Sequence, residues 1–189
     1  MPALDREARA NDILGIQEAP EDIADLPRGS VPYLPCGVDE ILAMVSEAPL
    51  SPEDVFVDLG SGLGRVAILA HLLSGARAIG LEIQEPLVHR ATASVAALGL
   101  DDVSFVHESA TDVELDGSVF FMYAPFNGAM LRCVVRRLED VSKKQRIVVC
   151  AVGLELRDVP WLVARTSSMV SLMFYDSRAP RYMLVTTNE

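Results

Sequence analysis

The amino-acid sequence predicts an α/β domain built on a largely parallel sheet. From Val55 onward, short runs rich in Val, Ile and Phe alternate with longer segments of helical period, the pattern of successive βαβ units. A glycine-rich stretch at 60–64 separates the first apolar run from the helix that follows it. The stretch at 146–152, continuously apolar after Arg146, suits a strand buried on both faces. Together these three observations favour parallel strands covered by helices.

The first half of the domain alternates regularly. We expect, in order, a strand at 55–59, a helix at 65–74, a strand at 77–82, a helix at 86–98 and a strand at 103–108. Pro86 falls in the first turn of its helix, where a missing amide donor costs nothing, and Gly99 stands at that helix's end. The apolar residues of 65–74 recur at helical spacing, so one face of this helix should cover the sheet.

The second half continues the alternation and then changes. We expect a strand at 119–124, a helix at 128–138, the strand at 146–152, and a further helix that carries Trp161 as a core residue. Two last strands, 169–175 and 182–187, are separated only by the turn-rich DSRAPR. This connection suits an antiparallel hairpin, which would close the parallel sheet.

The segment before the first strand divides in two. Residues 1–30 are predicted to form an amino-terminal helical arm with a loosely periodic pattern, and the main domain is expected over 31–189. Within the latter, 38–45 has helical period. No internal repeat or second domain is indicated.

Composition excludes several classes of protein. No apolar run approaches the roughly 20 residues that span a bilayer, so we expect no membrane segment. The acidic amino terminus lacks the basic start and apolar core of a secretory signal, which predicts a cytoplasmic protein. The three cysteines and three histidines are scattered, so neither a disulfide framework nor a metal site is expected.

The charge balance disfavours nucleic acid as a partner. The chain has 16 basic and 27 acidic residues, a net charge of −11, whereas a protein that follows a phosphate backbone needs clustered Lys and Arg. One basic stretch, 132–146, is interpreted mainly as a solvated helix face followed by a turn.

The strongest motif is Asp58-Leu-Gly60-Ser61-Gly62-Leu-Gly64, between the first strand and its helix. Glycines there let the loop turn sharply and let a ligand approach the backbone. A nucleotide site also predicts an acidic residue at the end of the second strand for ribose hydroxyls, and Glu82 stands there. A purely structural turn is the alternative for the glycine run.

The spacing argues against a nicotinamide dinucleotide. The fingerprint GxGxxG would place its third glycine where this chain has Arg65. Asp58 would also repel a pyrophosphate, whereas it suits a cationic ligand such as S-adenosylmethionine (SAM).

At these residues the sequence resembles the class I SAM-dependent methyltransferases over nearly all of 31–189. The resemblance implies a Rossmann-like seven-stranded sheet of order 3-2-1-4-5-7-6 with strand 7 antiparallel, and S-adenosylhomocysteine as the product. It also implies roles for the motif. Asp58 and Ser61 would belong to the cofactor loop, and the three glycines would lie against methionine and ribose. Glu82 would hold the ribose. Ile83 would pack on the adenine, and Ser109 and Ala110 would lie near the adenine amino group.

A narrower resemblance concerns the acceptor. VPYLPCGVDEIL at 31–42, followed by the glycine motif, is similar to small non-SET protein-lysine methyltransferases, in which such a loop lines the acceptor channel. This implies an acceptor role for Tyr33, with Leu34 and Pro35 beside it. The chain departs from that group at Cys36-Gly37, where Thr-Pro is common.

The end of the fourth strand supplies the remaining candidates, since ligands of open α/β sheets bind at the carboxyl ends of strands. Tyr123, Phe126 and Asn127 form an aromatic and amide cluster there, which we interpret as catalytic together with Tyr33; Tyr123 is also a candidate cofactor contact. Core packing, with Asn127 capping the next helix, is the alternative.

The sequence thus predicts a SAM-dependent methyltransferase that acts on a protein side chain such as lysine. A small-molecule methyltransferase and a SAM-binding module without catalysis remain as alternatives.

Overall fold

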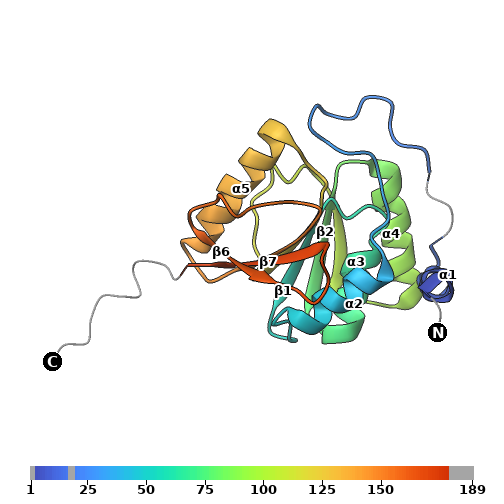
Figure 1. The fold of residues 1–189 in the computed structure, drawn as a ribbon. Helices are drawn as coiled ribbons and strands as arrows, with labels where there is room; N and C mark the ends of the chain where they lie inside the picture. Colours follow the sequence, from blue (N-terminus) through green and yellow to red (C-terminus); the bar gives the residue numbers. More distant parts are fainter. Residues whose placement is uncertain (1–2, 17–19, 179–189) are drawn as a thin grey trace.

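The computed structural model describes residues 3–16 and 20–178, which form a seven-stranded sheet with helices on both faces (Figure 1). The sheet order is β3-β2-β1-β4-β5-β7-β6. The first five strands pair in parallel, and β7 runs antiparallel to both β5 and β6. This confirms the α/β class, the strand order and the antiparallel seventh strand.

The element bounds agree closely with the sequence pattern through β5. The helices are α1 Ala3–Leu14, α2 Val38–Glu47, α3 Arg65–Ser74, α4 Glu85–Leu98 and α5 Gly128–Ser142. The strands are β1 Val55–Leu59, β2 Arg77–Glu82, β3 Val103–His107, β4 Val119–Tyr123, β5 Val148–Val152, β6 Leu162–Thr166 and β7 Leu172–Ser177.

Alternation along the central strands builds two cores, one on each face of the sheet. Phe56 of β1 and Phe121 of β4 point to the face that α2 and α3 cover. Their neighbours Val57 and Phe120 point to the opposite face, where α5 packs. Because side chains two apart share a face, Asp58 lies on the same face as Phe56, beneath the start of α3.

The carboxyl-terminal part corrects two predictions. The hairpin exists, but it pairs β7 with β6 upstream rather than with 182–187, which lies outside the described residues. In addition, no helix separates β5 from β6; 153–161 is a turn-rich connection. Trp161 ends this connection and packs half-buried against the α5-side core. Gly153, Asp158 and Pro160 lie in this connection, and these residue types favour turns over a helix.

The amino-terminal helix α1 is held beside the start of α3 by polar contacts. Arg65, the first residue of α3, donates to Glu7 and Asn11 of α1 and to the carbonyl oxygen of Cys36. Glu7 also accepts a hydrogen bond of 2.6 Å from the Val38 amide at the start of α2. One carboxylate of α1 therefore accepts from the first amide of α2 and from the side chain of the first residue of α3. None of the helices in the described ranges has the length and apolar character needed to cross a bilayer.

Candidate functional site

The carboxyl ends of β1, β2 and β4 meet at a cavity of about 240 Å³. The parallel register aligns Leu59 with Leu81, so the loops that follow these two strands are neighbours. The amides of Gly60 and Ser61 both donate to the Leu81 carbonyl oxygen at 2.9 Å. These bonds fold the glycine loop over the end of β2 and fix the floor of the cavity.

Glu82 is anchored at the end of β2 by three backbone amides. Its Oε2 accepts from Gly62, 2.8 Å away, and its Oε1 accepts from Ile83 and Gln84 at 2.9 Å. Burial raises the pKa of this carboxyl, and the amide hydrogen bonds act in the opposite direction. The carboxylate is therefore held in one orientation, and these three bonds leave about one acceptor position, on Oε2, for a ligand such as the expected ribose.

Asp58 is almost fully buried in the same cavity. Burial, followed by the nearby charge of Glu82, raises its pKa to about 8, while a hydrogen bond from the Ala67 amide lowers it. Asp58 Oδ2 and Ser61 Oγ find no hydrogen-bond partner among the described residues. A buried carboxylate oxygen without a partner is costly unless a ligand supplies a donor or positive charge.

The charges of the cavity suit a cationic ligand. Arg65 also lines it, but Glu7 of α1 lies 2.5 Å from this guanidinium and offsets its charge. The acidic side chains of Asp58 and Glu82 therefore face a ligand at the glycine loop, and a positively charged ligand would favour the ionised form of Asp58. Such a site would repel a pyrophosphate and fits SAM, which carries a sulfonium and an ammonium group. No cluster of three His, Cys, Asp or Glu side chains suited to a metal occurs in the part of the chain described.

The glycines of the motif differ in what they do. Gly60 lines the cavity, whereas Gly62 and Gly64 are absent from its lining. A side chain on Gly62 would meet the ring of Tyr33, and one on Gly64 would meet the ring of Phe105. Gly62 also has a φ of +53°, which favours glycine. Gly62 therefore makes room for Tyr33, and Gly64 allows α3 to pack closely on β3.

Of the three residues expected near the adenine, two line the cavity and one does not. Ala110 lines the cavity and Ile83 does as well, next to Glu108. Ser109 does not line it; its hydroxyl pairs with Thr111 Oγ1 at 2.7 Å. The part of the cavity where the adenine is expected is lined by Ile83, Ala110 and Glu108, whereas the Ser109 side chain bonds within its own turn.

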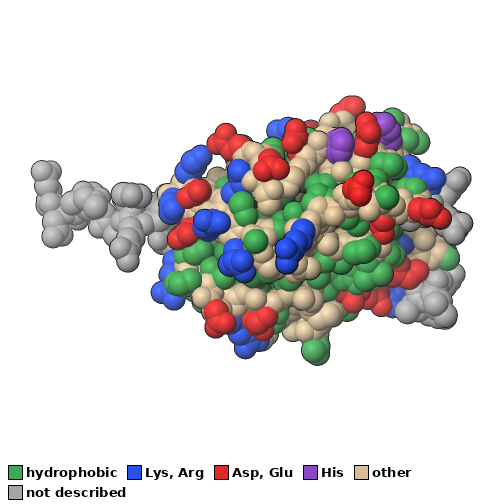
Figure 2. All heavy atoms as spheres, turned by 90° about the horizontal axis from the view of Figure 1, so that it is seen from above, with side chains coloured by type: hydrophobic (Ala, Val, Ile, Leu, Met, Phe, Trp, Pro, Cys, Tyr) green, Lys and Arg blue, Asp and Glu red, His purple; other side chains and the backbone are tan. Residues whose placement is uncertain are grey.

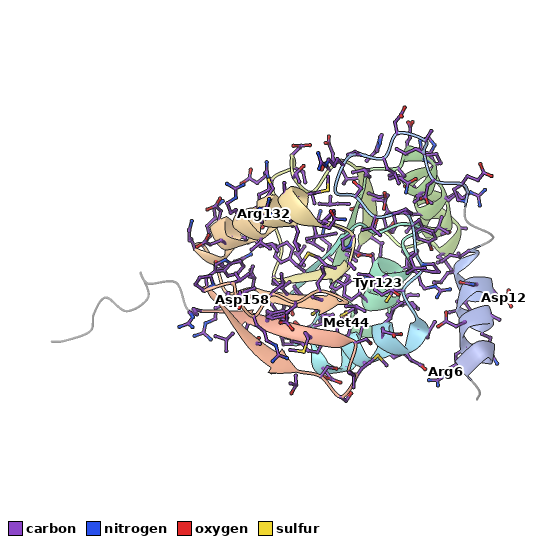
Figure 3. All side chains as sticks on the ribbon, turned by 45° about the horizontal axis from the view of Figure 1, so that its top comes forward. Arg6, Asp12, Met44, Tyr123, Arg132 and Asp158 are labelled. Atoms are coloured by element: carbon purple, nitrogen blue, oxygen red, sulfur yellow. The ribbon has the colours of Figure 1, made fainter. Side chains whose placement is uncertain are left out.

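Of the four acceptor candidates, three line the cavity and one does not. Tyr33, Tyr123 and the buried Phe126 all line the cavity. Asn127 is exposed and outside the lining; it occupies the N-cap position of α5 without a side-chain capping bond. Figure 3 shows Tyr123 near the centre of the molecule, between α5 and the helices of the other face. The structure therefore brings three of the four candidates together.

Sequence reasoning missed three residues of this site. Gln84 lines the cavity and is 3% exposed, Arg65 links it to α1, and Ala124 has a φ of +41°, the only positive value outside glycine among the described residues. The strain at Ala124 directs the chain from Tyr123 into Pro125 at the cavity wall. Of these, only Arg65 gave a signal, as the unexpected residue after the last glycine.

Comparison with known proteins agrees with this geometry. The sequence profile of the family described as "Histone methylation protein DOT1" matches residues 35–122. No curated protein sequence matches significantly.

Solved structures share the fold at low sequence identity. An RNA methyltransferase from Salinibacter ruber, in complex with S-adenosylhomocysteine, is 22% identical with a TM-score of 0.62, covering 78% of this chain and 95% of its own. A putative RNA methyltransferase from Pyrococcus horikoshii is 13% identical with a TM-score of 0.61, covering 92% and 100%. A SAM-dependent methyltransferase from Aquifex aeolicus is 15% identical with a TM-score of 0.56, covering 74% and 88%.

The strand order, the two carboxylates at the glycine loop and the profile match together identify the chain as a class I SAM-dependent methyltransferase.

Proposed function

We propose that this enzyme methylates the side-chain nitrogen of a protein lysine. The observation that carries the proposal is that the cavity holding Asp58 and Glu82 also has an uncharged aromatic wall. The lining residues from 30–36, 121–126 and 152–153 include Tyr33, Tyr123 and Phe126 and no Asp, Glu, Lys, Arg or His.

The cofactor end is assigned to the carboxylates. Glu82 would hold the ribose hydroxyls, and Asp58 with Ser61 would serve the positively charged part of SAM. When bound, SAM supplies an electrophilic methyl group and leaves as S-adenosylhomocysteine. The side chains of the cavity then need only bring a nucleophile into line with the methyl group and exclude water.

The aromatic wall suits a lysine that must lose its proton before it reacts. Removing an ammonium group from water lowers its pKa, so an apolar channel favours the neutral amine. Burial raises the pKa of both Tyr33 and Tyr123, which keeps their phenols protonated at neutral pH. These tyrosines would act as hydrogen-bond donors and ring surfaces rather than as bases.

Two further points support a protein acceptor. The matching profile belongs to a family described by histone methylation, and the chain's net charge of −11 favours a basic partner over a polyanion. Figure 2 looks down on the molecule from above Figure 1; Lys and Arg gather mainly in its left half, toward α5, and hydrophobic side chains cross its centre. RNA is the competing acceptor in the test, because the similar structures include an RNA methyltransferase and a protein described as a putative RNA methyltransferase.

The test is incubation of the full chain and methyl-labelled SAM with cell extract. We expect labelled material that protease destroys and ribonuclease leaves intact, and its acid hydrolysate should contain methylated lysine. Tyr123→Ala should lose most of the labelling, a much larger loss than that in its affinity for S-adenosylhomocysteine. Label confined to RNA or to small molecules would overturn the lysine proposal.

A further inference from the structure

Residues 20–36, here termed the strap, cross the cavity at the carboxyl edge of the sheet. Figure 1 shows this segment arching over the upper end of the sheet between α1 and α2. On the β4 side, the amide of Val31 donates to Pro125 at 3.1 Å, and the amide of Asn127 donates to Gly29 at 2.8 Å. These bonds flank an isolated antiparallel bridge between Ser30 and Phe126. The strap is therefore fastened by backbone to the acceptor side.

On the β2 side, the strap is fastened through the side chain of Gln84. Its Oε1 accepts from the Ile23 amide at 2.9 Å, and its Nε2 donates to Asp22 Oδ1 at 2.7 Å. The same oxygen of Asp22 accepts from the Tyr33 amide at 3.0 Å. One buried side-chain amide thus ties two points of the strap to the end of β2, and through Asp22 it sets the backbone of Tyr33.

The backbone of Gln84 connects this fastening to the cofactor end. Its amide donates to Glu82 Oε1, and Gly62, which accommodates the ring of Tyr33, donates to Glu82 Oε2. The carboxylate assigned to ribose and the aromatic ring assigned to the acceptor are therefore linked along two short routes. A shift of the strap would move Tyr33 relative to Glu82.

We propose that Gln84 is a positioning residue of the methyltransferase, which holds the strap and Tyr33 across the cofactor pocket through Asp22. Gln84 acts on the ligand through the strap rather than by contact. The proposal rests on the cavity's being the cofactor site. It does not depend on which acceptor is methylated, because its test uses S-adenosylhomocysteine alone.

The chain offers a direct probe of the strap. Arg28 is the only Lys or Arg between Arg9 and Arg65, so trypsin has one cleavage site in the strap, before Gly29. Cleavage there yields fragments of 1–28 and 29–189, which a mass spectrum distinguishes from cuts elsewhere. Because proteolysis follows the population of the open form when opening is fast, the cleavage rate at Arg28 reports how often the strap detaches.

Four variants of the full chain test the proposal: Gln84→Ala, Asp22→Ala, the double variant, and Gln145→Ala as a matched control. Gln145 also donates a side-chain hydrogen bond, to the carbonyl oxygen of Gly117, but lies away from the cavity lining. Both single variants of the pair should speed cleavage at Arg28 and weaken S-adenosylhomocysteine binding by about tenfold, the scale of two lost hydrogen bonds. The double variant should resemble the single ones, because both break one linkage. The control should match the parent protein.

Several outcomes would overturn the proposal. Unchanged cleavage and affinity in Gln84→Ala would show that the side chain does not hold the strap. Faster cleavage with unchanged affinity would show that the strap does not position the ligand. Weaker binding in Gln84→Ala with an unaffected Asp22→Ala would mean that Gln84 contacts the ligand directly. Asp22 is exposed, so its variant should fold even if Gln84→Ala does not.

Discussion

SAM binding should tighten as the pH rises from 6 to 8, because Asp58 must lose a proton before it can face a cation. Burial and the charge of Glu82 raise the pKa of Asp58 to about 8 in the ligand-free protein. The group is then mostly protonated at neutral pH. If SAM binds only the ionised form, its apparent dissociation constant should be about tenfold weaker at pH 7, and about 100-fold weaker at pH 6, than the limiting value.

The sign of the linked stability effect is opposite. The folded-state pKa lies above the ordinary value of 3.8, so protonated Asp58 favours the folded protein at low pH. That contribution declines as the pH rises from about 4 through about 8. The melting temperature of the ligand-free protein should therefore fall over this window through Asp58, while the stabilisation by added SAM grows.

Calorimetry of SAM binding at pH 6, 7 and 8 measures the effect. Repeating each titration in buffers of different ionisation enthalpy should reveal about one proton released per SAM bound at pH 7. Above pH 8 the amino group of SAM itself, with an ordinary pKa of about 8, loses its charge, so affinity should pass through a maximum. Asp58→Asn should flatten the rise. A pH-independent affinity between 6 and 8, or the same slope in Asp58→Asn, would refute the reasoning.

Three other predictions concern the remaining contacts. Glu82→Gln should weaken SAM binding by about 2 kcal/mol, because a neutral amide replaces a charged acceptor. It should also lower the melting temperature, because three backbone amides face the Glu82 oxygens and the new amide group must oppose at least one of them. Calorimetry beside a melting curve checks this, and parental affinity would contradict it. Phe126→Ala should lower the methylation rate and destabilise the fold by about 3 kcal/mol, because Phe126 is buried. Asn127→Ala changes an exposed side chain and should affect the rate and the stability only slightly. Equal losses in the two variants would contradict this. Arg65→Met should lower the unfolding free energy by about 2 kcal/mol, because it removes the contacts between α1 and α3. Denaturant titration of Arg65→Met, Glu7→Gln and the double variant should show losses that do not add. Additive losses would contradict the contact.

The sequence was informative where a physical rule acts over a short stretch. Alternating apolar runs and helical periods located the strands through β5 and their covering helices, because the two-residue and 3.6-residue periods are local. The glycine loop and Glu82 predicted the edge of the sheet at which the cavity lies, since ligand binding there requires particular residue types at the ends of adjacent strands. The hairpin prediction was wrong because it relied on strand propensity alone and therefore overlooked 162–166. That segment forms a strand by pairing with β7, which propensity does not reveal.

Only the tertiary structure decided how the two ends of the site are joined. Nothing in the local sequence pattern distinguishes Gln84 from an ordinary polar residue at the start of a helix. Asp22 is one of several acidic residues in its segment. Their roles arise from hydrogen bonds between residues about 60 positions apart, across segments without periodic structure. The same holds for Phe126, which faces the cavity, and for Asn127 beside it, which does not. Strand and helix positions follow from short-range periodicity, whereas the pKa of Asp58 and the placement of the strap depend on which distant groups the folded chain brings within a few ångströms.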